Sequence, residues 1–106
     1  MGQFVVVAYR PRPGKSRQLL GLLREHLPIL RAEGLATDRP AYVMRAADGT
    51  FVEVFEWKSA KAIEKAHRNP AVQAMWARFD KVCTYESLAN LQESKGPFSP
   101  FQPVDL

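Results

Sequence analysis

Hydrophobic and polar positions change their period along the chain, and these changes predict an alternation of strands and helices. Residues 3–9 form a nearly continuous apolar run rich in β-branched side chains, which is typical of a central strand buried on both faces. From residue 15 the apolar positions repeat at helical spacing, as Leu19, Leu20, Leu22, Leu23, Leu27 and Leu30. Gly34 matches a glycine just past a helix end, so we expect this helix to end near Glu33, with a kink or a division at Pro28.

The most informative pattern covers residues 51–76, where a strand of period two runs into a helix. Ser59 is suited to cap the start of that helix. Asn69 and Pro70 then predict a break and a restart, because asparagine is a good N-cap and proline suits the first helical position. After the break the apolar positions form one stripe, made of Val72, Met75, Trp76 and Phe79.

Asp48 and Gly49 predict a two-residue hairpin turn between the second and third strands. Such a turn fixes the register and places Met44 opposite Glu53. Because side chains alternate between faces, one face carries Tyr42, Met44, Phe51, Glu53, Phe55 and Trp57, and the other carries Val43, Arg45, Val52, Val54 and Glu56. We expect Arg45 and Glu56 of this second face to make a structural polar contact across the sheet or across the dimer.

Strands after the first are expected over 41–47, 51–57 and 82–91. The resulting order of strand, helix, strand, strand, helix and strand is that of a ferredoxin-like α+β fold. This fold has a four-stranded antiparallel sheet with both helices on one face, which leaves the opposite, apolar face bare. We therefore expect a two-fold symmetric homodimer in which two sheets pack face to face into a barrel-like core.

Length and composition fit a single domain over residues 1–106. Residues 95–106 are expected to form an irregular proline-rich tail, with two phenylalanines that dock on the same subunit or on the partner subunit. The net charge of +4 comes from scattered basic residues interleaved with acidic ones, which argues against a nucleic-acid surface. The single cysteine is typical of a reducing compartment. No apolar run reaches the roughly 20 residues that span a bilayer, and no cleavable leader is apparent, so we expect a cytoplasmic protein.

The residues Glu53–Ser59, followed by Ala62, His67 and 70–72, resemble those of the dimeric α/β-barrel superfamily typified by the antibiotic biosynthesis monooxygenases. The resemblance implies a homodimer with a pocket between sheet and helices in each subunit. Members of the superfamily include cofactor-independent oxygenases of aromatic polyols, heme-degrading enzymes, isomerases and proteins with no established activity. The heme-degrading branch has an asparagine on the first strand, and this chain has none there, so we set that branch aside.

Two residues are candidates for proton transfer, His67 and Glu53. His67 lies just before the helix break, where a side chain can point into a cavity, and imidazole titrates close to neutral pH as general-base chemistry requires. Alternatively, it is a surface histidine at a helix end. Glu53 lies on the aromatic face of its strand and is either a catalytic acid or base or one member of a buried structural pair. The other histidine, His26, is expected to be peripheral.

Four aromatic residues are candidates to line a pocket for a flat aromatic ligand, namely Tyr9, Trp57, Trp76 and Tyr85. Each of them can instead belong to the plain core. Cys83 has no neighbouring group that would activate it, so we expect a small buried hydrophobe. No metal-ligand cluster, phosphate-binding loop or Ser-His-Asp order occurs, so no cofactor and no metal are expected.

Two functions remain open. The first is a small cofactor-independent monooxygenase-like protein that acts on an aromatic or enolisable molecule, with His67 or Glu53 taking a proton from it. The second is a non-catalytic dimeric protein that binds a small ligand or is associated with stress. RNA binding through a related topology is disfavoured, because Glu53 would repel a phosphate. The first function is favoured if His67 and Glu53 reach the same cavity, and the second is favoured if His67 is exposed to solvent.

Overall fold

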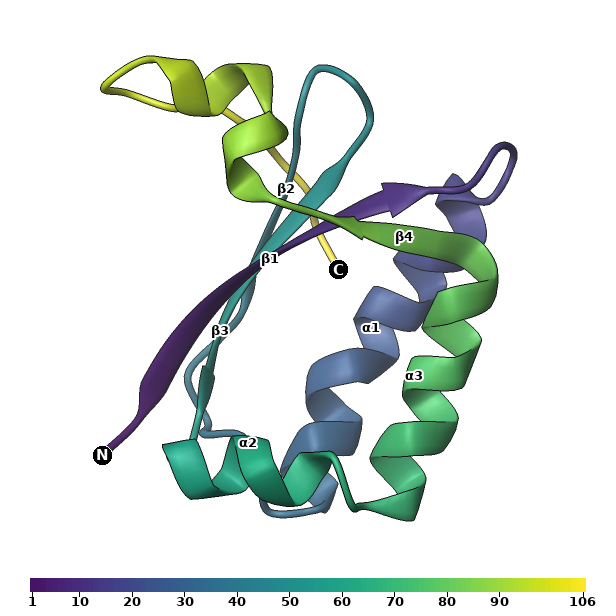
Figure 1. Cartoon of the computed structure of the whole chain (residues 1–106), viewed down its shortest axis with the longest axis vertical. Coiled ribbons are helices and arrows are strands. Elements are labelled where there is room, and N and C mark those ends of the chain that lie inside the picture. Colours follow the sequence, from purple (N-terminus) through teal and green to yellow (C-terminus); the bar gives the residue numbers. More distant parts are fainter.

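An antiparallel sheet carries the three helices on one of its faces (Figure 1). The computed structural model describes residues 1–106, with the sheet order β4-β1-β3-β2-β5. The strands are β1 (Gln3–Pro11), β2 (Tyr42–Arg45), β3 (Phe51–Trp57), β4 (Cys83–Glu86) and β5 (Gln102–Pro103). The helices are α1 (Ser16–Ala32), α2 (Ala60–Ala66) and α3 (Pro70–Val82), followed by the 3-10 turns η1 (Leu88–Asn90) and η2 (Gln92–Lys95). No helix is both long and apolar enough to cross a bilayer.

The ferredoxin-like order of elements is confirmed, but the sheet has a fifth strand that the sequence did not predict. Part of the expected irregular tail returns to the sheet as its edge strand β5, where Gln102 and Pro103 pair with Arg45 and Met44 of β2. The backbone N–H of Val104 extends this pairing by donating to Val43 O over 2.9 Å. A proline is compatible with such a strand because it lies at the sheet edge, where a missing N–H breaks no ladder.

Helix α1 ends as predicted, at Ala32 with Glu33 as its C-cap. Gly34 has a φ of 72°, and the hydrogen bonds of a Schellman motif follow, from Leu35 N to Leu30 O and from Gly34 N to Arg31 O, each 2.9 Å long. Pro28 does not divide the helix, which runs through it as one element of 17 residues. The buried side of this helix packs against α3 and the sheet.

The break between α2 and α3 is also confirmed, and both caps are the predicted ones. Ser59 Oγ accepts from Ala62 N over 3.0 Å, and Asn69 Oδ1 accepts from Val72 N over 3.1 Å. The two caps replace backbone partners that a helix start lacks. As a result, α2 lies across one end of the sheet while α3 runs beside α1 (Figure 1).

The predicted hairpin register is wrong by one residue. The loop contains three residues, because Ala46 N donates to Thr50 O over 2.8 Å and Gly49 N donates to Ala46 O over 3.0 Å. Gly49 has a φ of 94°, a conformation that suits glycine at the last position of a three-residue hairpin loop. Val43, and not Met44, therefore lies opposite Glu53.

In the observed register, each residue of β2 lies on the face of the sheet opposite to the predicted one. Val43 and Arg45 join Phe51 and Glu53 on the face toward the helices, whereas Tyr42 and Met44 lie on the outer face. The expectation that Arg45 and Glu56 share a face and meet across the sheet is consequently wrong. The Arg45 guanidinium lies 4.7 Å from the centre of the Phe51 ring. Glu56 Oε1 accepts from Thr37 Oγ1 over 2.8 Å and pairs with Arg39 Nε over 2.9 Å.

The fourth strand is shorter than the predicted 82–91 and ends at Glu86. Ser87 then caps the first 3-10 turn by accepting from Ala89 N over 3.3 Å. The two 3-10 turns lie at the end of the sheet that is remote from α2, and the chain then returns along β2 (Figure 1). Leu91 and Phe101 pack there on Ala8 and Val52, so this part of the chain covers one portion of the outer face.

The remaining portion of the outer face is apolar and open. Phe4, Val6 and Tyr42 expose 60%, 46% and 71% of their area, although each belongs to a strand inside the sheet. The expectation of a bare apolar face therefore holds for only part of it. We call the group Phe4, Val6 and Tyr42 the outer patch.

Candidate functional site

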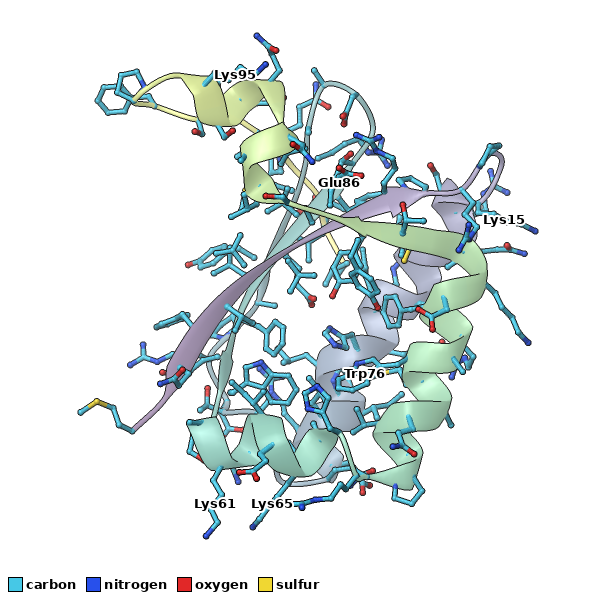
Figure 2. The ribbon with its side chains drawn as sticks, viewed as in Figure 1. Lys15, Lys61, Lys65, Trp76, Glu86 and Lys95 are labelled. Atoms are coloured by element: carbon cyan, nitrogen blue, oxygen red, sulfur yellow. The ribbon has the colours of Figure 1, made fainter.

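A cavity of about 440 Å³ lies between the helix-facing side of the sheet and helices α1 and α3. Its lining is almost entirely apolar and aromatic, and consists of Val5, Val7, Tyr9, His26, Phe55, Trp57, Trp76, Phe79, Asp80 and Tyr85. Figure 2 shows Trp76 reaching from α3 toward the sheet. Such a lining, with few polar groups, is typical of a site for a small and largely apolar molecule.

Glu53 lies behind this cavity and is completely buried. Its Oε1 atom accepts two hydrogen bonds, from the Tyr9 hydroxyl over 2.7 Å and from His26 Nδ1 over 2.8 Å. Its Oε2 atom is buried without a partner. Since a buried carboxylate is stable only with such partners, Tyr9 and His26 hold Glu53 in place, and Glu53 in turn orients them.

His26 is the polar group that this arrangement presents to the cavity. It comes from α1, is 3% exposed, and packs its ring edge-on against Phe55 and Phe79 at centroid distances of 5.1 and 5.4 Å. Because Nδ1 donates to the Glu53 carboxylate, the lone pair of the neutral ring is on Nε2, which has no partner in the chain. A histidine fixed in this way is suited to accept a proton from a molecule in the cavity.

The two tyrosines at the site are held in their neutral forms. Burial, and then the charge of Glu53, raise the pKa of Tyr9 well above its usual value of 10.0. Burial raises the pKa of Tyr85 to about 12, with smaller contributions from Cys83, Asp80 and Glu53. The two rings lie 5.6 Å apart, and Tyr9 also stacks on Phe79 at 5.4 Å. Both hydroxyls are therefore hydrogen-bond donors throughout the neutral pH range.

All four aromatic residues expected at a pocket do line the cavity, namely Tyr9, Trp57, Trp76 and Tyr85. That they bind a ligand stays a prediction. The new hairpin register leaves this result unchanged, because Tyr9 and Trp57 pair with residues of β3 and β1 on the helix-facing side.

The structure does not bring His67 to Glu53. His67 is exposed at the end of α2, where its Nδ1 atom lies 2.9 Å from Ile63 O and its ring packs edge-on against Trp76 at 5.2 Å. It does not line the cavity. Of the two predicted proton-transfer residues, only Glu53 is at the site, and its imidazole partner is His26.

The expectation that His26 is peripheral is wrong, and the sequence contained a sign of its position. His26 follows Leu23 by three residues and precedes Leu30 by four, so it belongs to the apolar stripe of α1. Asp80 was also missed. It follows Trp76 by four residues on α3, which places both side chains on the same side of that helix and next to the cavity.

Cys83 matches its prediction as a small buried residue. Its thiol donates to Phe79 O over 3.2 Å, and burial raises its pKa to about 11, so it remains a thiol near neutral pH. No three residues among the histidines, cysteines, aspartates and glutamates are grouped so that they could hold a metal ion.

No protein-family model matches this sequence, and no curated protein matches it. Several solved structures do match the fold. The cofactor-independent oxygenase SnoaB from Streptomyces nogalater superposes with a TM-score of 0.65 at 14% identity, over 80% of this chain and 85% of that one.

Two further structures are similar over most of their length. Rv0793 from Mycobacterium tuberculosis has a TM-score of 0.62 at 23% identity, over 90% of this chain and 100% of that one. NE2512 from Nitrosomonas europaea, a protein of unknown function, has a TM-score of 0.57 at 17% identity, over 76% of this chain and 77% of that one. Identities this low carry information about the fold alone. The chain thus shares its fold with the antibiotic biosynthesis monooxygenase-like proteins of the dimeric α/β-barrel type.

Proposed function

We propose that this protein is a cofactor-independent, monooxygenase-like enzyme that acts on an aromatic or enolisable small molecule bound in the cavity. The observation that carries the proposal is the pair of His26 and Glu53, in which Nδ1 and Oε1 lie 2.8 Å apart next to an aromatic lining. SnoaB, a cofactor-independent oxygenase, has the same fold, and this supports the class of reaction without identifying a substrate.

In the first step, Nε2 of His26 takes a proton from an acidic carbon of the substrate, such as a methylene group between a carbonyl-bearing ring and a second ring. The negative charge left on the substrate is delocalised over its aromatic system. The positive charge that appears on the imidazole is stabilised by Glu53, which is already hydrogen-bonded to Nδ1. Glu53 is therefore a positioning residue in this proposal, and His26 is the base.

In the second step, the substrate anion is oxidised by dioxygen and a carbon–oxygen bond forms, giving a peroxide anion. Protonated His26 returns its proton to this anion. Loss of the second carbon-bound hydrogen and cleavage of the oxygen–oxygen bond then give a carbonyl group and water. One oxygen atom ends in the product and the other in water, so that a methylene compound and dioxygen are converted into a ketone and water.

The aromatic lining has a separate task in this proposal. Trp57 and Phe79 are buried, and Trp76 is partly exposed at the cavity. Their ring faces and edges suit contact with a flat substrate, since aromatic pairs gain energy from offset stacking and edge-to-face contacts. A substrate held there would displace water from His26.

We also propose that the protein is a homodimer that pairs its sheets across the outer patch. Phe4, Val6 and Tyr42 form an apolar surface on strands that the helices leave uncovered. Exposed apolar groups of this kind are typical of association surfaces. A two-fold axis through the patch would bury the same residues of both subunits against each other.

The enzyme proposal is tested by oxygen uptake with a panel of aromatic ketones that have an acidic methylene group, and of polyphenols. His26→Gln and His67→Gln form the informative pair, because these are the two histidines of the chain. We expect His26→Gln to lower the turnover of an active compound by about a hundredfold or more, as the loss of a general base does. His67→Gln is expected to keep most of it.

Two outcomes would contradict this assignment. If His67→Gln is the variant that loses turnover, the base is the exposed histidine and the pair with Glu53 is structural. If panel compounds bind in calorimetry and none consumes oxygen, the protein is the alternative, a non-catalytic ligand-binding protein.

A further inference from the structure

The cavity has a second polar group, the carboxylate of Asp80. Eight of the ten lining residues are hydrophobic, and the other two are His26 and Asp80. Asp80 lies in the last turn of α3 and is exposed. Its carboxylate makes no hydrogen bond or ion pair, which distinguishes it from Glu53 at the same site.

A cation near Asp80 already exists in the chain, but it forms no ion pair with the carboxylate. Arg12 donates from Nε and Nη2 to the main-chain oxygen of Asp80, over 3.1 and 2.9 Å. The guanidinium thus binds the end of the helix, where backbone oxygens lack partners. No ion pair between Arg12 and the Asp80 carboxylate is formed within 4.0 Å, whereas Glu25, Asp48, Glu56 and Glu86 all have arginine partners.

The position of Asp80 increases the negative potential at this part of the cavity. An aspartate in the last turn of a helix lies at the negative end of the helix dipole, where cations are favoured. The Asp80 charge also contributes to the raised pKa of Tyr85, so its field reaches the cavity lining. Trp76 and Tyr85 line the same cavity, and the faces of such rings attract cations as well.

We propose that Asp80 binds a protonated amine of the ligand, so that the substrates of this cavity are flat aromatic compounds with a basic amino group. The inference rests on the proposed function and narrows its substrate class. The aromatic part of the ligand occupies the apolar lining, and the amine fixes which end of the molecule faces His26. Asp80 acts here in recognition and takes no part in the proton transfer.

The test compares two probes of nearly equal size, naphthylethylamine and naphthylethanol, by isothermal titration calorimetry at low salt. The amine is expected to bind about fivefold more tightly than the alcohol, the upper range for a partly exposed ion pair. The preference should shrink as salt is added, because screening weakens exposed pairs. Asp80→Asn should abolish it, and Asp38→Asn, which removes the same charge from an exposed residue outside the cavity, should leave it intact.

The outcomes separate this inference from the function on which it rests. If both probes bind equally to the unchanged protein, or if the preference survives in Asp80→Asn, the amine inference is wrong and the aromatic cavity stands. If neither probe binds while the protein is folded, both are overturned. If the preference depends on Asp80 and persists in His26→Gln, recognition and proton transfer are separate, as proposed.

Discussion

His26 Nδ1 and Glu53 Oε1 lie 2.8 Å apart, although 27 residues separate them in the chain. The helix α1 and the strand β3 that carry them meet at the cavity, and Tyr9 from β1 completes the contact over 2.7 Å. Three elements therefore converge on one buried carboxylate. Charge-assisted hydrogen bonds of this kind fix the geometry of the side chains that form them.

Replacing Glu53 by glutamine tests whether its charge matters for the reaction. Glutamine has the same shape but cannot stabilise a positive imidazole, so we expect turnover to fall by about a hundredfold. Glu56→Gln is the matched control, since Glu56 lies three residues further along β3 on the outer face, bonded to Thr37 and Arg39. Oxygen uptake by the two variants gives the comparison, and equal losses in both would contradict a specific role of Glu53.

The bond between Tyr9 and Glu53 should contribute measurably to stability. Tyr9→Phe removes the hydroxyl and leaves Glu53 with His26 alone, which we expect to lower the free energy of unfolding by about 2 kcal/mol. Tyr85→Phe removes a hydroxyl that has no partner and is expected to change it by less than about 0.5 kcal/mol. Urea unfolding at neutral pH measures both values. A Tyr9→Phe variant as stable as Tyr85→Phe would show that this buried bond contributes little.

Alkaline solution should destabilise the fold. The pKa of Tyr85 is raised from 10.0 to about 12 and that of Tyr9 is raised further by burial and Glu53, so the folded chain retains protons that the unfolded chain releases. Stability from this source is complete below about pH 10 and is lost as the pH rises through about 12. Urea unfolding at a series of alkaline pH values should show the decline. The decline in the free energy of unfolding with pH should be shallower in Tyr9→Phe. A decline of the same slope in both proteins would argue against Tyr9 as a source of the pH dependence.

The outer patch is expected to hold two subunits together. Val6→Glu introduces a charge at its centre, so we expect sedimentation equilibrium to report twice the chain mass of 12.0 kDa for the unchanged protein and about that mass itself for the variant. Ala74→Glu introduces the same charge on an exposed position of α3, on the helical side of the sheet, and should leave the dimer intact. A monomeric unchanged protein would contradict the proposal directly.

Element types and helix ends could be predicted because they depend on neighbours in the sequence. Ser59, Asn69 and Gly34 act within one turn of their own positions, and each has the predicted role in the structure. The hairpin register could not be fixed in the same way. Asp48 and Gly49 are compatible with loops of two or three residues, and the three-residue loop moves every residue of β2 to the other face.

The site was predictable to the extent that aromatic residues of adjacent strands share a face. Tyr9 and Trp57 both line the cavity, whereas the pairing of His26 with Glu53 depends on how α1 packs on the sheet. The spacing of His26 from Leu23 and Leu30 is a sign of an inward position, contrary to our expectation, but no local pattern specifies what the side chain meets there. The fifth strand was missed for a similar reason. Gln102 and Pro103 have no strand-like pattern, and they pair only with β2, which is distant in the sequence.

The chain has two tryptophans, and both Trp57 and Trp76 line the cavity. The tryptophan emission of the protein, excited selectively near the red edge of the absorption band, therefore originates entirely from residues that line the place where a ligand would lie. Filling of the cavity should change the intensity or wavelength of that emission without any label or added reporter. Libraries of compounds can thus be screened for occupancy before any reaction is known.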